Sequence, residues 1–420
     1  MKFYTLSLGC KVNEYEIDAV EEQFLNKGYI LDKDNPDVFI INTCSVTSVA
    51  DQKSRQHIRK IRKNYPNLKC LVVMGCYSQH AGKFISEELG ADIVIGTSKR
   101  NILPTLVDTY IKTTKKILMI DEDFRHFKYE SFGVIPNINK TRAYIKIQDG
   151  CDNFCSYCII PFTRGNSRSR DKDEIVAEIK SLVNKGYKEV VLTGIHTAGY
   201  GKDLDNFTFS DLVEKILNEV PNLYRLRISS IEESEIDDKF ISLLKKDNRI
   251  ANHLHIPTQS GCSKTLKNMH RKYNVDDFYK KIELIRNARP DIAITTDVIV
   301  GFPSETEEDF METFNFIKKI KFAELHVFPF SAREKTIAMK MPNQIDPSIK
   351  KDRVARLIKL GNELNLEYRK QFIGKDLEVL FEDYNKDTKT WKGHTSNYLE
   401  VSYQSDDNLH GKVLKLNYKI

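Results

Sequence analysis

The chain has 420 residues, of which 40% are hydrophobic and 30% are charged, and its formal net charge is +6. This length exceeds a typical single domain and allows two or three, each with its own core. No apolar run approaches the ~18 residues of a membrane-spanning helix, and the N-terminus lacks a basic segment followed by an apolar one. We therefore expect a cytoplasmic protein with no membrane partner. The modest positive charge permits a nucleic-acid partner but does not require one.

The first third of the chain alternates between strands and helices. Apolar strands are predicted at residues 3–8, 38–41, 71–74 and 93–96, and helices at 14–26 and over a basic stretch that ends near Pro66. Continuous apolar strands between amphipathic helices indicate a parallel sheet that is covered on both faces. We expect residues 1–112 to form this α/β domain, and the weakly periodic stretch 101–139 to connect it to the next domain.

Three cysteines share one position relative to these strands. Cys10, Cys44 and Cys76 each lie just past the C-terminal end of a predicted strand, whereas Cys70 lies at the start of its strand. Because the carboxyl ends of parallel strands meet at one edge of a sheet, the first three thiols are expected to lie together. They are either buried small side chains or metal ligands. A structural zinc site needs a fourth ligand, for which His80 is the nearest candidate, whereas an iron–sulfur cluster on three thiolates keeps one iron open.

A second set of cysteines follows a predicted strand at residues 143–148. Cys151, Cys155 and Cys158 have the spacing CxxxCxxC, directly after the turn Asp149-Gly150. In a large chain, clustered cysteines are more often metal ligands than disulfide partners. Three soft ligands on one short loop predict a metal cluster with one coordination position left for another molecule.

Two segments of the chain are rich in basic residues, one well before this loop and one directly after it. Residues 53–63 carry six positive charges and no acid. A solvated helix face explains this run, and so does an anionic partner that offsets the repulsion between like charges. Three arginines follow the second cysteine set, Arg164, Arg168 and Arg170. They either hold a phosphate or carboxylate or are solvated at the start of a helix.

The middle of the chain repeats strand and helix with a regular period. Strands are predicted at residues 143–148, 189–193, 224–229, 253–257, 292–300 and 324–330, with helices such as 172–185, 210–219 and 275–287 between them. Six βα units are too few for a closed eight-stranded barrel. We expect residues 137–367 to form an open, partial (βα)6 barrel with its site at the C-terminal mouth, where the CxxxCxxC loop lies. A helix-rich stretch at 346–372 follows.

The pattern changes in the last segment of the chain, where short strand-like stretches replace the alternation of strands and helices. Strand-like stretches at residues 377–381, 399–403 and 412–416, separated by polar turns, predict that residues 371–420 form a small antiparallel β-barrel. Trp391 lies between Lys389 and Lys392. An aromatic ring among cations can stack on a nucleic-acid base, and a core residue of the small barrel is the equally good alternative.

The sequence CDNFCSYC at residues 151–158 resembles the signature of the radical S-adenosylmethionine (radical SAM) enzymes, including Tyr157 before the last cysteine. This resemblance implies that Cys151, Cys155 and Cys158 hold a 4Fe–4S cluster. The fourth iron would bind S-adenosylmethionine, and one electron from the cluster would produce a 5′-deoxyadenosyl radical.

Three further motifs narrow the resemblance. LGCKVN at residues 8–13, NTCSVT at 42–47 and MGC at 74–76 look like the N-terminal domain of the methylthiotransferases, and residues 371–420 resemble their RNA-binding TRAM domain. This implies that Cys10, Cys44 and Cys76 hold a second, auxiliary 4Fe–4S cluster that carries the sulfur to be inserted. LGCKVN and residues 192–196 resemble the branch that acts on N6-threonylcarbamoyladenosine at position 37 of tRNA, next to the anticodon.

The same resemblance implies the remaining components. The reaction would methylthiolate C2 of the adenine with no side chain as acid or base. An electron donor such as flavodoxin or ferredoxin and a sulfur donor would take part. By motif position, the residues expected to bind S-adenosylmethionine are Tyr157, Thr193, Gly194, Ser229, Gln259 and Gly301. The alternatives are a ribosomal-protein methylthiotransferase and a non-catalytic iron–sulfur protein that binds RNA or carries electrons.

Overall fold

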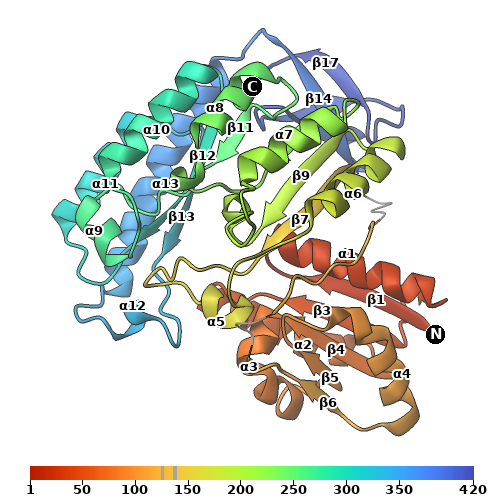
Figure 1. Cartoon of the computed structure of the whole chain (residues 1–420). Coiled ribbons are helices and arrows are strands. Elements are labelled where there is room, and N and C mark those ends of the chain that lie inside the picture. The colour runs from red at the N-terminus through yellow and green to blue at the C-terminus, as the bar shows by residue number, and fades with distance from the viewer. Residues whose placement is uncertain (124–126, 136–139) are drawn as a thin grey trace.

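The computed structural model describes residues 1–123, 127–135 and 140–420. A parallel α/β sheet at the N-terminus packs below a central partial barrel, and a small antiparallel sheet lies at the far end of that barrel (Figure 1). Within these ranges no helix combines the length and the apolar composition that crossing a membrane requires.

The N-terminal sheet has six parallel strands in the order β2-β1-β3-β4-β5-β6. On β3, Val38 and Ile40 pack into the core on one face, while Phe39 and Ile41 pack into the core on the other. Both faces are therefore buried, which explains why the strands read as continuous apolar runs. The strands are β1 (Lys2–Ser7), β2 (Ile30–Leu31), β3 (Val38–Thr43), β4 (Cys70–Gly75), β5 (Ile93–Ile95) and β6 (Ile117–Met119), and the helices are α1 (Lys11–Asn26), α2 (Ser48–Asn64), α3 (Cys76–Glu87), η1 (Arg100–Ile102) and α4 (Leu103–Thr113).

The prediction of a connector over residues 101–139 is wrong in its first part. Helix α4 buries Leu103 and Val107 against the sheet, and β6 pairs with β5, so the N-terminal sheet extends to Met119. Two buried apolar positions and a strand of three residues are too short a pattern to detect in the sequence. The predicted boundary at residue 137 lies outside the described residues, and the division into 1–112, 137–367 and 371–420 stays a prediction.

The central domain confirms the open (βα)6 barrel. The strands β10-β9-β7 and β11-β12-β13 form two parallel sheets, and a parallel bridge between Leu226 and Ile250 joins them. The short strand β8 (Arg168–Ser169) pairs antiparallel with β7 at one edge. The six parallel strands are β7 (Arg142–Asp149), β9 (Glu189–Gly194), β10 (Arg225–Ile228), β11 (His253–His255), β12 (Ala293–Val300) and β13 (Glu324–Pro329).

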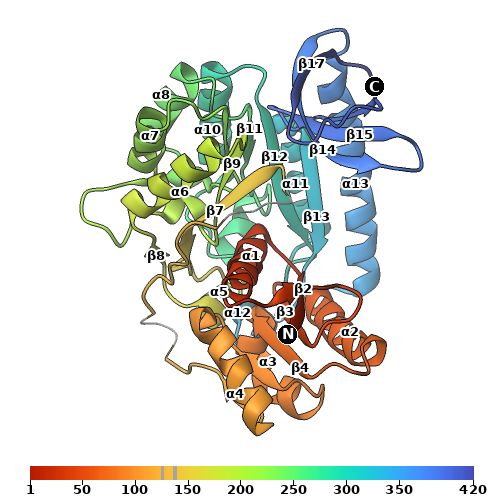
Figure 2. The ribbon, with the colours of Figure 1, turned by 90° about the vertical axis from the view of Figure 1, so that its right-hand side faces the viewer.

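Helices cover the outside of this barrel and bury its largest apolar core. The long helix α13 runs along the barrel beside β13 and leads to the C-terminal sheet (Figure 2). The helices are α5 (Ile160–Arg164), α6 (Lys172–Asn184), η3 (Thr197–Gly199), α7 (Phe209–Glu219), η4 (Glu233–Glu235), α8 (Asp238–Lys246), α9 (Ser263–Asn268), α10 (Val275–Ala288), α11 (Glu307–Ile320), α12 (Ile337–Lys340) and α13 (Pro347–Lys370).

The C-terminal segment is antiparallel, as predicted, but it forms a sheet of four strands, of which β15 was not predicted, in the order β16-β15-β14-β17. Its strands are β14 (Asp376–Asn385), β15 (Thr390–Thr395), β16 (Glu400–Gln404) and β17 (Val413–Asn417). Trp391 lies on β15, is 7% exposed and packs against Val379, Phe381 and Leu409. The core interpretation of Trp391 is therefore confirmed, and its ring is not a free platform for a base.

Candidate active site at the mouth of the barrel

The structure brings Cys10, Cys44 and Cys76 to one edge of the N-terminal sheet, where Cys10 precedes α1, Cys44 follows β3 and Cys76 begins α3. The backbone at Gly9 packs so closely on Cys44 that an added Cβ would lie 3.0 Å from the Cys44 sulfur. The Asn13 amide donates hydrogen bonds to the carbonyls of Leu8 (2.8 Å) and Thr43 (3.1 Å). These bonds fix two of the three cysteine loops against each other.

Burial favours the protonated form of two of these thiols, Cys44 and Cys76. Burial, with the neighbouring thiols Cys76 and Cys10, raises the pKa of Cys44 to about 12, and burial likewise raises the pKa of Cys76. Thiolates, not thiols, bind metals, so iron must supply the positive charge that stabilises the ionised form. The Arg164 guanidinium already contributes, because its Nε donates a hydrogen bond of 3.2 Å to the Cys76 sulfur.

The loop that carries Cys151, Cys155 and Cys158 is fixed at the mouth of the barrel. The Cys151 amide bonds to the Gly165 carbonyl (3.0 Å), and the Ser156 amide bonds to the Met269 carbonyl (3.0 Å). Burial raises the pKa of Cys151 to about 12 and that of Cys158 further.

Arg271 plays the same part at this loop as Arg164 does at the first set. Its Nη1 donates to the Cys155 sulfur at 3.4 Å and lies 3.0 Å from a carboxylate oxygen of Glu232. The Arg271 side chain is almost fully buried. Each cysteine set therefore has one buried guanidinium beside a sulfur.

The spacing of the sulfur atoms distinguishes a cluster from a single ion. Among the described residues, only His255, Asp297 and His326 offer three ligand atoms that all lie within 4.8 Å of one another. In neither cysteine set do all three sulfurs come that close. A zinc ion would hold two thiolates about 3.8 Å apart, given a Zn–S bond of about 2.3 Å. Three thiols that do not converge on one ion are compatible with a multi-iron cluster, which three thiolates can hold with one iron left open.

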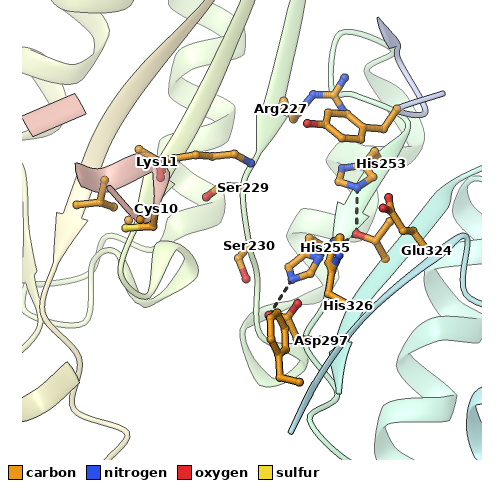
Figure 3. A pocket seen from close by; sticks show the side chains of 17 residues that line it. Cys10, Lys11, Arg227, Ser229, Ser230, His253, His255, Asp297, Glu324 and His326 are labelled. Atoms are coloured by element: carbon orange, nitrogen blue, oxygen red, sulfur yellow. Dashed lines mark hydrogen bonds and ion pairs between the residues drawn. The ribbon is translucent and has the colours of Figure 1, made fainter. Parts of the chain in front are cut away.

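Three cavities adjoin the two cysteine sets. One of about 190 Å³ is lined by all three cysteines of the CxxxCxxC loop. One of about 220 Å³ runs from Cys158 to Val46 and Thr47, which follow Cys44. The largest, of about 630 Å³, has Cys10 on one wall and strands of the barrel on the other (Figure 3). The cysteine sets thus face neighbouring hollows that share lining residues at the C-terminal mouth of the barrel.

The predicted S-adenosylmethionine residues divide among these cavities. Tyr157 and Gln259 line both smaller ones, and Thr193, Gly194 and Ser229 line the largest. Gly301 is not among the lining residues. It has a φ of +69°, and an added Cβ would lie 2.4 Å from the Lys350 side chain, so packing and backbone geometry already explain the glycine. The cofactor contacts themselves stay predictions.

Several polar residues of the largest cavity were not singled out in the sequence. His253 and His255 alternate along β11 and both line the cavity, as side chains two positions apart share one face of a strand. His255 Nδ1 lies 2.9 Å from Thr295 Oγ1, and its Nε2 lies 3.4 Å from Asp297. The pattern His-x-His on a predicted barrel strand was the available signal. The other missed polar lining residues are Lys11, Arg227, Ser230, Thr295, Asp297, Glu324, His326 and Tyr398.

The interpretation that three arginines are solvated at the start of a helix is wrong. These arginines are Arg164, Arg168 and Arg170. All three are buried, and they hold carboxylates of the chain itself. Arg164 Nη1 lies 2.8 Å from Glu16 and 3.0 Å from Asp149, Arg168 binds Asp149 at 2.9 Å, and Arg170 pairs with Glu178.

Lys146 and Arg100 complete a buried ionic network with Glu16 and Asp149. Lys146 Nζ lies 2.7 Å from each of these carboxylates, and Arg100 Nη1 lies 2.6 Å from Glu16. Asp149 stands two residues before Cys151, while Arg164 contacts the Cys76 sulfur. The network therefore joins the two cysteine sets through fully buried ion pairs.

Comparison with known proteins identifies the family. Residues 145–317 match the Radical SAM superfamily, and residues 2–96 match the Uncharacterized protein family UPF0004. The threonylcarbamoyladenosine tRNA methylthiotransferase MtaB of Bacillus subtilis (strain 168) is 44% identical over 416 residues, 98% of this chain and 92% of that protein. The chain belongs to the radical SAM methylthiotransferases.

A second relative and one solved structure are also similar to this chain. The tRNA-2-methylthio-N(6)-dimethylallyladenosine synthase of Thermoanaerobacter sp. (strain X514) is 35% identical over 421 residues, 98% of this chain and 88% of that protein. The solved radical S-adenosylmethionine methyltransferase TsrM from Kitasatospora setae has a TM-score of 0.61 at 15% identity, covering 80% of this chain and 74% of that one. The second likeness is one of fold alone.

Family membership confirms the predicted chemistry of this methylthiotransferase. It is an enzyme whose cofactors are S-adenosylmethionine and two 4Fe–4S clusters, and each of the two cysteine sets offers three free thiols to a cluster. The non-catalytic alternative, an iron–sulfur protein that only carries electrons or binds RNA, is set aside, as is a ribosomal-protein substrate.

Proposed function

We propose that this methylthiotransferase modifies C2 of the adenine in N6-threonylcarbamoyladenosine at position 37 of tRNA. The observation that carries this proposal is the cavity of about 630 Å³ that Cys10 shares with the barrel and with Tyr398 of the C-terminal sheet. Its volume lies within the range of small-molecule sites, about 300–1,000 Å³. The threonylcarbamoyladenosine substrate is favoured over the dimethylallyl one by the identities of 44% and 35% to the respective relatives.

In this proposal the two cysteine sets have different tasks. Cys151, Cys155 and Cys158 hold the cluster that binds S-adenosylmethionine, and Cys10, Cys44 and Cys76 hold the auxiliary cluster. When bound, these groups supply a carbon radical and the methylthio group. C2 needs radical chemistry because its C–H bond is too strong and too weakly acidic for a side-chain base to remove the proton. Accordingly, no amino-acid side chain acts as an acid or a base in the reaction at C2.

The side chains of the protein instead bind and orient. Tyr157 and Gln259, which line the hollow beside the CxxxCxxC loop, contact S-adenosylmethionine. Thr193, Gly194 and Ser229, which belong to the same predicted S-adenosylmethionine set, line the large cavity that Cys10 also lines. Gly301 belongs to the same predicted set, although it lies beside Lys350. Arg164 and Arg271 hold one sulfur of each cysteine set by a hydrogen bond.

The tRNA is expected to contact two surfaces outside the cavity. Lys53, Arg59, Lys60 and Lys63 are exposed along α2, whereas Arg62 pairs with Asp92. The C-terminal sheet, proposed as the TRAM RNA-binding domain, supplies Tyr398 to the cavity itself. The reaction also requires an electron donor such as flavodoxin or ferredoxin and a sulfur donor, and a tRNA substrate would place the enzyme in the cytoplasm.

Two measurements test this function. Reduced, reconstituted enzyme should form 5′-deoxyadenosine from S-adenosylmethionine and should convert threonylcarbamoyladenosine in tRNA into its 2-methylthio form. A strain that lacks the gene should lose that nucleoside on mass-spectrometric analysis of its tRNA. If the nucleoside persists and the 2-methylthio form of dimethylallyladenosine disappears instead, the proposed substrate is wrong.

A further inference from the structure

The largest cavity is electrically asymmetric. Lys11 lies on the wall that α1 supplies, Arg227 lies on β10 beside His253, and Asp297 and Glu324 lie on β12 and β13 of the opposite wall (Figure 3). A ligand with a single negative charge would be attracted to the wall that carries Lys11 and repelled by the wall that carries Asp297 and Glu324. The cavity therefore distinguishes the two ends of a charged ligand.

Arg227 is already committed to the protein. Its Nε lies 2.6 Å from Glu189, and its Nη atoms donate to the carbonyls of Thr395 and Ser396 at 3.2 Å each. Its guanidinium also lies 4.8 Å from the centre of the Tyr398 ring. These contacts anchor the C-terminal sheet to the barrel, so Arg227 has little capacity left for a substrate.

Lys11, in contrast, makes no close ion pair with the described residues, although Glu189 and Glu14 act on it from a longer distance. It follows Cys10 directly, at the start of α1, and its side chain extends across the cavity towards Ser229 (Figure 3). In the part of the chain that the structure describes, no carboxylate lies within 4.0 Å of its ammonium and it donates no hydrogen bond. The other inward lysine of this region, Lys146, has two carboxylates at 2.7 Å. A half-buried ammonium with no close ion pair is costly, so a ligand is the expected partner.

A second, independent polar group in the same cavity also lacks a partner. His253 is 7% exposed, and its Nε2 lies 3.1 Å from Thr295 Oγ1, but its Nδ1 has no hydrogen-bond partner among the described residues. The ring stacks on Tyr398 with 5.0 Å between centroids. Buried polar atoms rarely lack a hydrogen-bond partner, so the unpaired Nδ1 atom also indicates that a ligand binds here.

We propose that Lys11 binds the carboxylate of the threonylcarbamoyl group and thereby selects an acidic N6 substituent over an uncharged one. This inference rests on the proposed function. Threonine joined through its nitrogen keeps a free carboxylate, which is ionised at neutral pH, whereas a dimethylallyl group is a hydrocarbon. A lysine–carboxylate contact is a charge-assisted hydrogen bond, and the carboxylates of Asp297 and Glu324 repel the same group from the opposite wall.

The position of Lys11 suits this role. In adenine, C2 and C6 flank the same ring nitrogen, so the N6 substituent reaches the side of the base on which C2 lies. A residue adjacent to Cys10, the cysteine that lines this cavity, is therefore well placed to hold the substituent while C2 faces the auxiliary cluster. Lys11 acts in this scheme as a specificity-determining residue.

The first experiment changes the substrate and leaves the enzyme intact. Wild-type holoenzyme is given an anticodon stem-loop RNA with threonylcarbamoyladenosine, or the same RNA in which the threonine carboxylate is a methyl ester. The ester has nearly the same shape but no charge. We expect kcat/KM to be about 10- to 100-fold lower for the ester, the range of a hydrogen bond to a charged group. Equal conversion of both RNAs would overturn the assignment of Lys11 without any variant.

The second experiment changes Lys11. Lys11→Met keeps the length of the side chain but removes the charge, so conversion of the acid should fall to that of the ester while the ester rate stays near its wild-type value. Lys11→Arg should restore part of the preference for the acid. Lys112→Met, at an exposed position on α4, is the matched control and should keep the full preference. Iron and sulfide content show that each variant carries its clusters.

The outcomes separate the two proposals. If Lys11→Met retains the wild-type preference, or loses both substrates in equal proportion, Lys11 does not read the carboxylate. If the wild-type enzyme forms no methylthio product on the acid RNA but does so on dimethylallyladenosine RNA, the proposed function fails, and an acidic substituent cannot be what Lys11 selects.

Discussion

Replacing Glu16 with glutamine should destabilise the folded enzyme by about 3–5 kcal/mol, the usual cost of removing one partner from a buried ion pair. Glu16 is fully buried, and its carboxylate lies 2.6 Å from Arg100, 2.7 Å from Lys146 and 2.8 Å from Arg164. Glutamine keeps the volume and one acceptor oxygen, so the substitution isolates the charge. Asp149 remains beside the same cations, which places the expected loss near the lower end of the range.

The loss should depend on pH in a defined direction. Burial alone raises the pKa of Glu16, but Arg100, Arg164 and Lys146 outweigh it and hold the pKa well below its usual range. A carboxyl with a depressed pKa stabilises the fold fully above its unfolded pKa of about 4.3, and this contribution disappears as the pH falls towards the folded value. The difference in the free energy of unfolding between wild type and Glu16→Gln should therefore be full at pH 7 and shrink below about pH 4.

Urea unfolding of the cluster-loaded protein, followed anaerobically by circular dichroism, measures this difference. Glu22→Gln is the matched control, because Glu22 lies on the same helix and only accepts a hydrogen bond from Asn26 near the surface. It should change the free energy of unfolding by no more than about 0.5 kcal/mol. If Glu16→Gln costs no more than Glu22→Gln at pH 7, the network does not stabilise the contact between α1 and the barrel, and the reasoning is refuted.

Three further predictions concern the site and the C-terminal sheet. Cys76→Ala should still cleave S-adenosylmethionine but should form no methylthio product, as measured by mass spectrometry; thiolated product at the wild-type level would contradict the auxiliary-cluster assignment. Gly75→Ala should lower the iron content towards half, because Gly75 has a φ of +105° and an added Cβ would lie 2.5 Å from the Thr43 carbonyl oxygen; unchanged iron content would show that the Cys76 loop tolerates the shift. Trp391→Ala should destabilise the C-terminal sheet by about 3–5 kcal/mol, while Trp391→Phe should keep RNA affinity; a Phe variant that is stable but binds RNA poorly would restore the base-stacking role.

The sequence predicted those parts of the site that depend on topology. Cys10, Cys44 and Cys76 could be grouped because the carboxyl ends of parallel strands share an edge, and the apolar strands that precede them were long enough to recognise. The six strands of the barrel were found for the same reason. Helix α4 and strands β6 and β15 were missed, since each offers few buried apolar positions to a periodicity search.

The parts that escaped prediction depend on contacts between distant segments. Arg164 was visible as a charge, but its partner Glu16 lies 148 residues away, so nothing local indicated that the guanidinium is buried. Tyr398 reaches the cavity because distant barrel residues, among them Arg227 and Arg142, hold the C-terminal segment against the barrel. Lys11 stood within a recognised motif, yet its lack of a close ion pair becomes apparent only once the cavity is formed.

The buried network also bears on how two clusters can act on one carbon atom. Arg164 contacts the Cys76 sulfur and Asp149, and Asp149 leads into the Cys151 loop. Lys146 ties the same Asp149 to Glu16 on α1. Fully buried, multiply bonded ion pairs resist sliding because any shift would leave a charge unpaired. The distance between the two cysteine sets is therefore fixed before substrate arrives, as positioning within about an ångström demands.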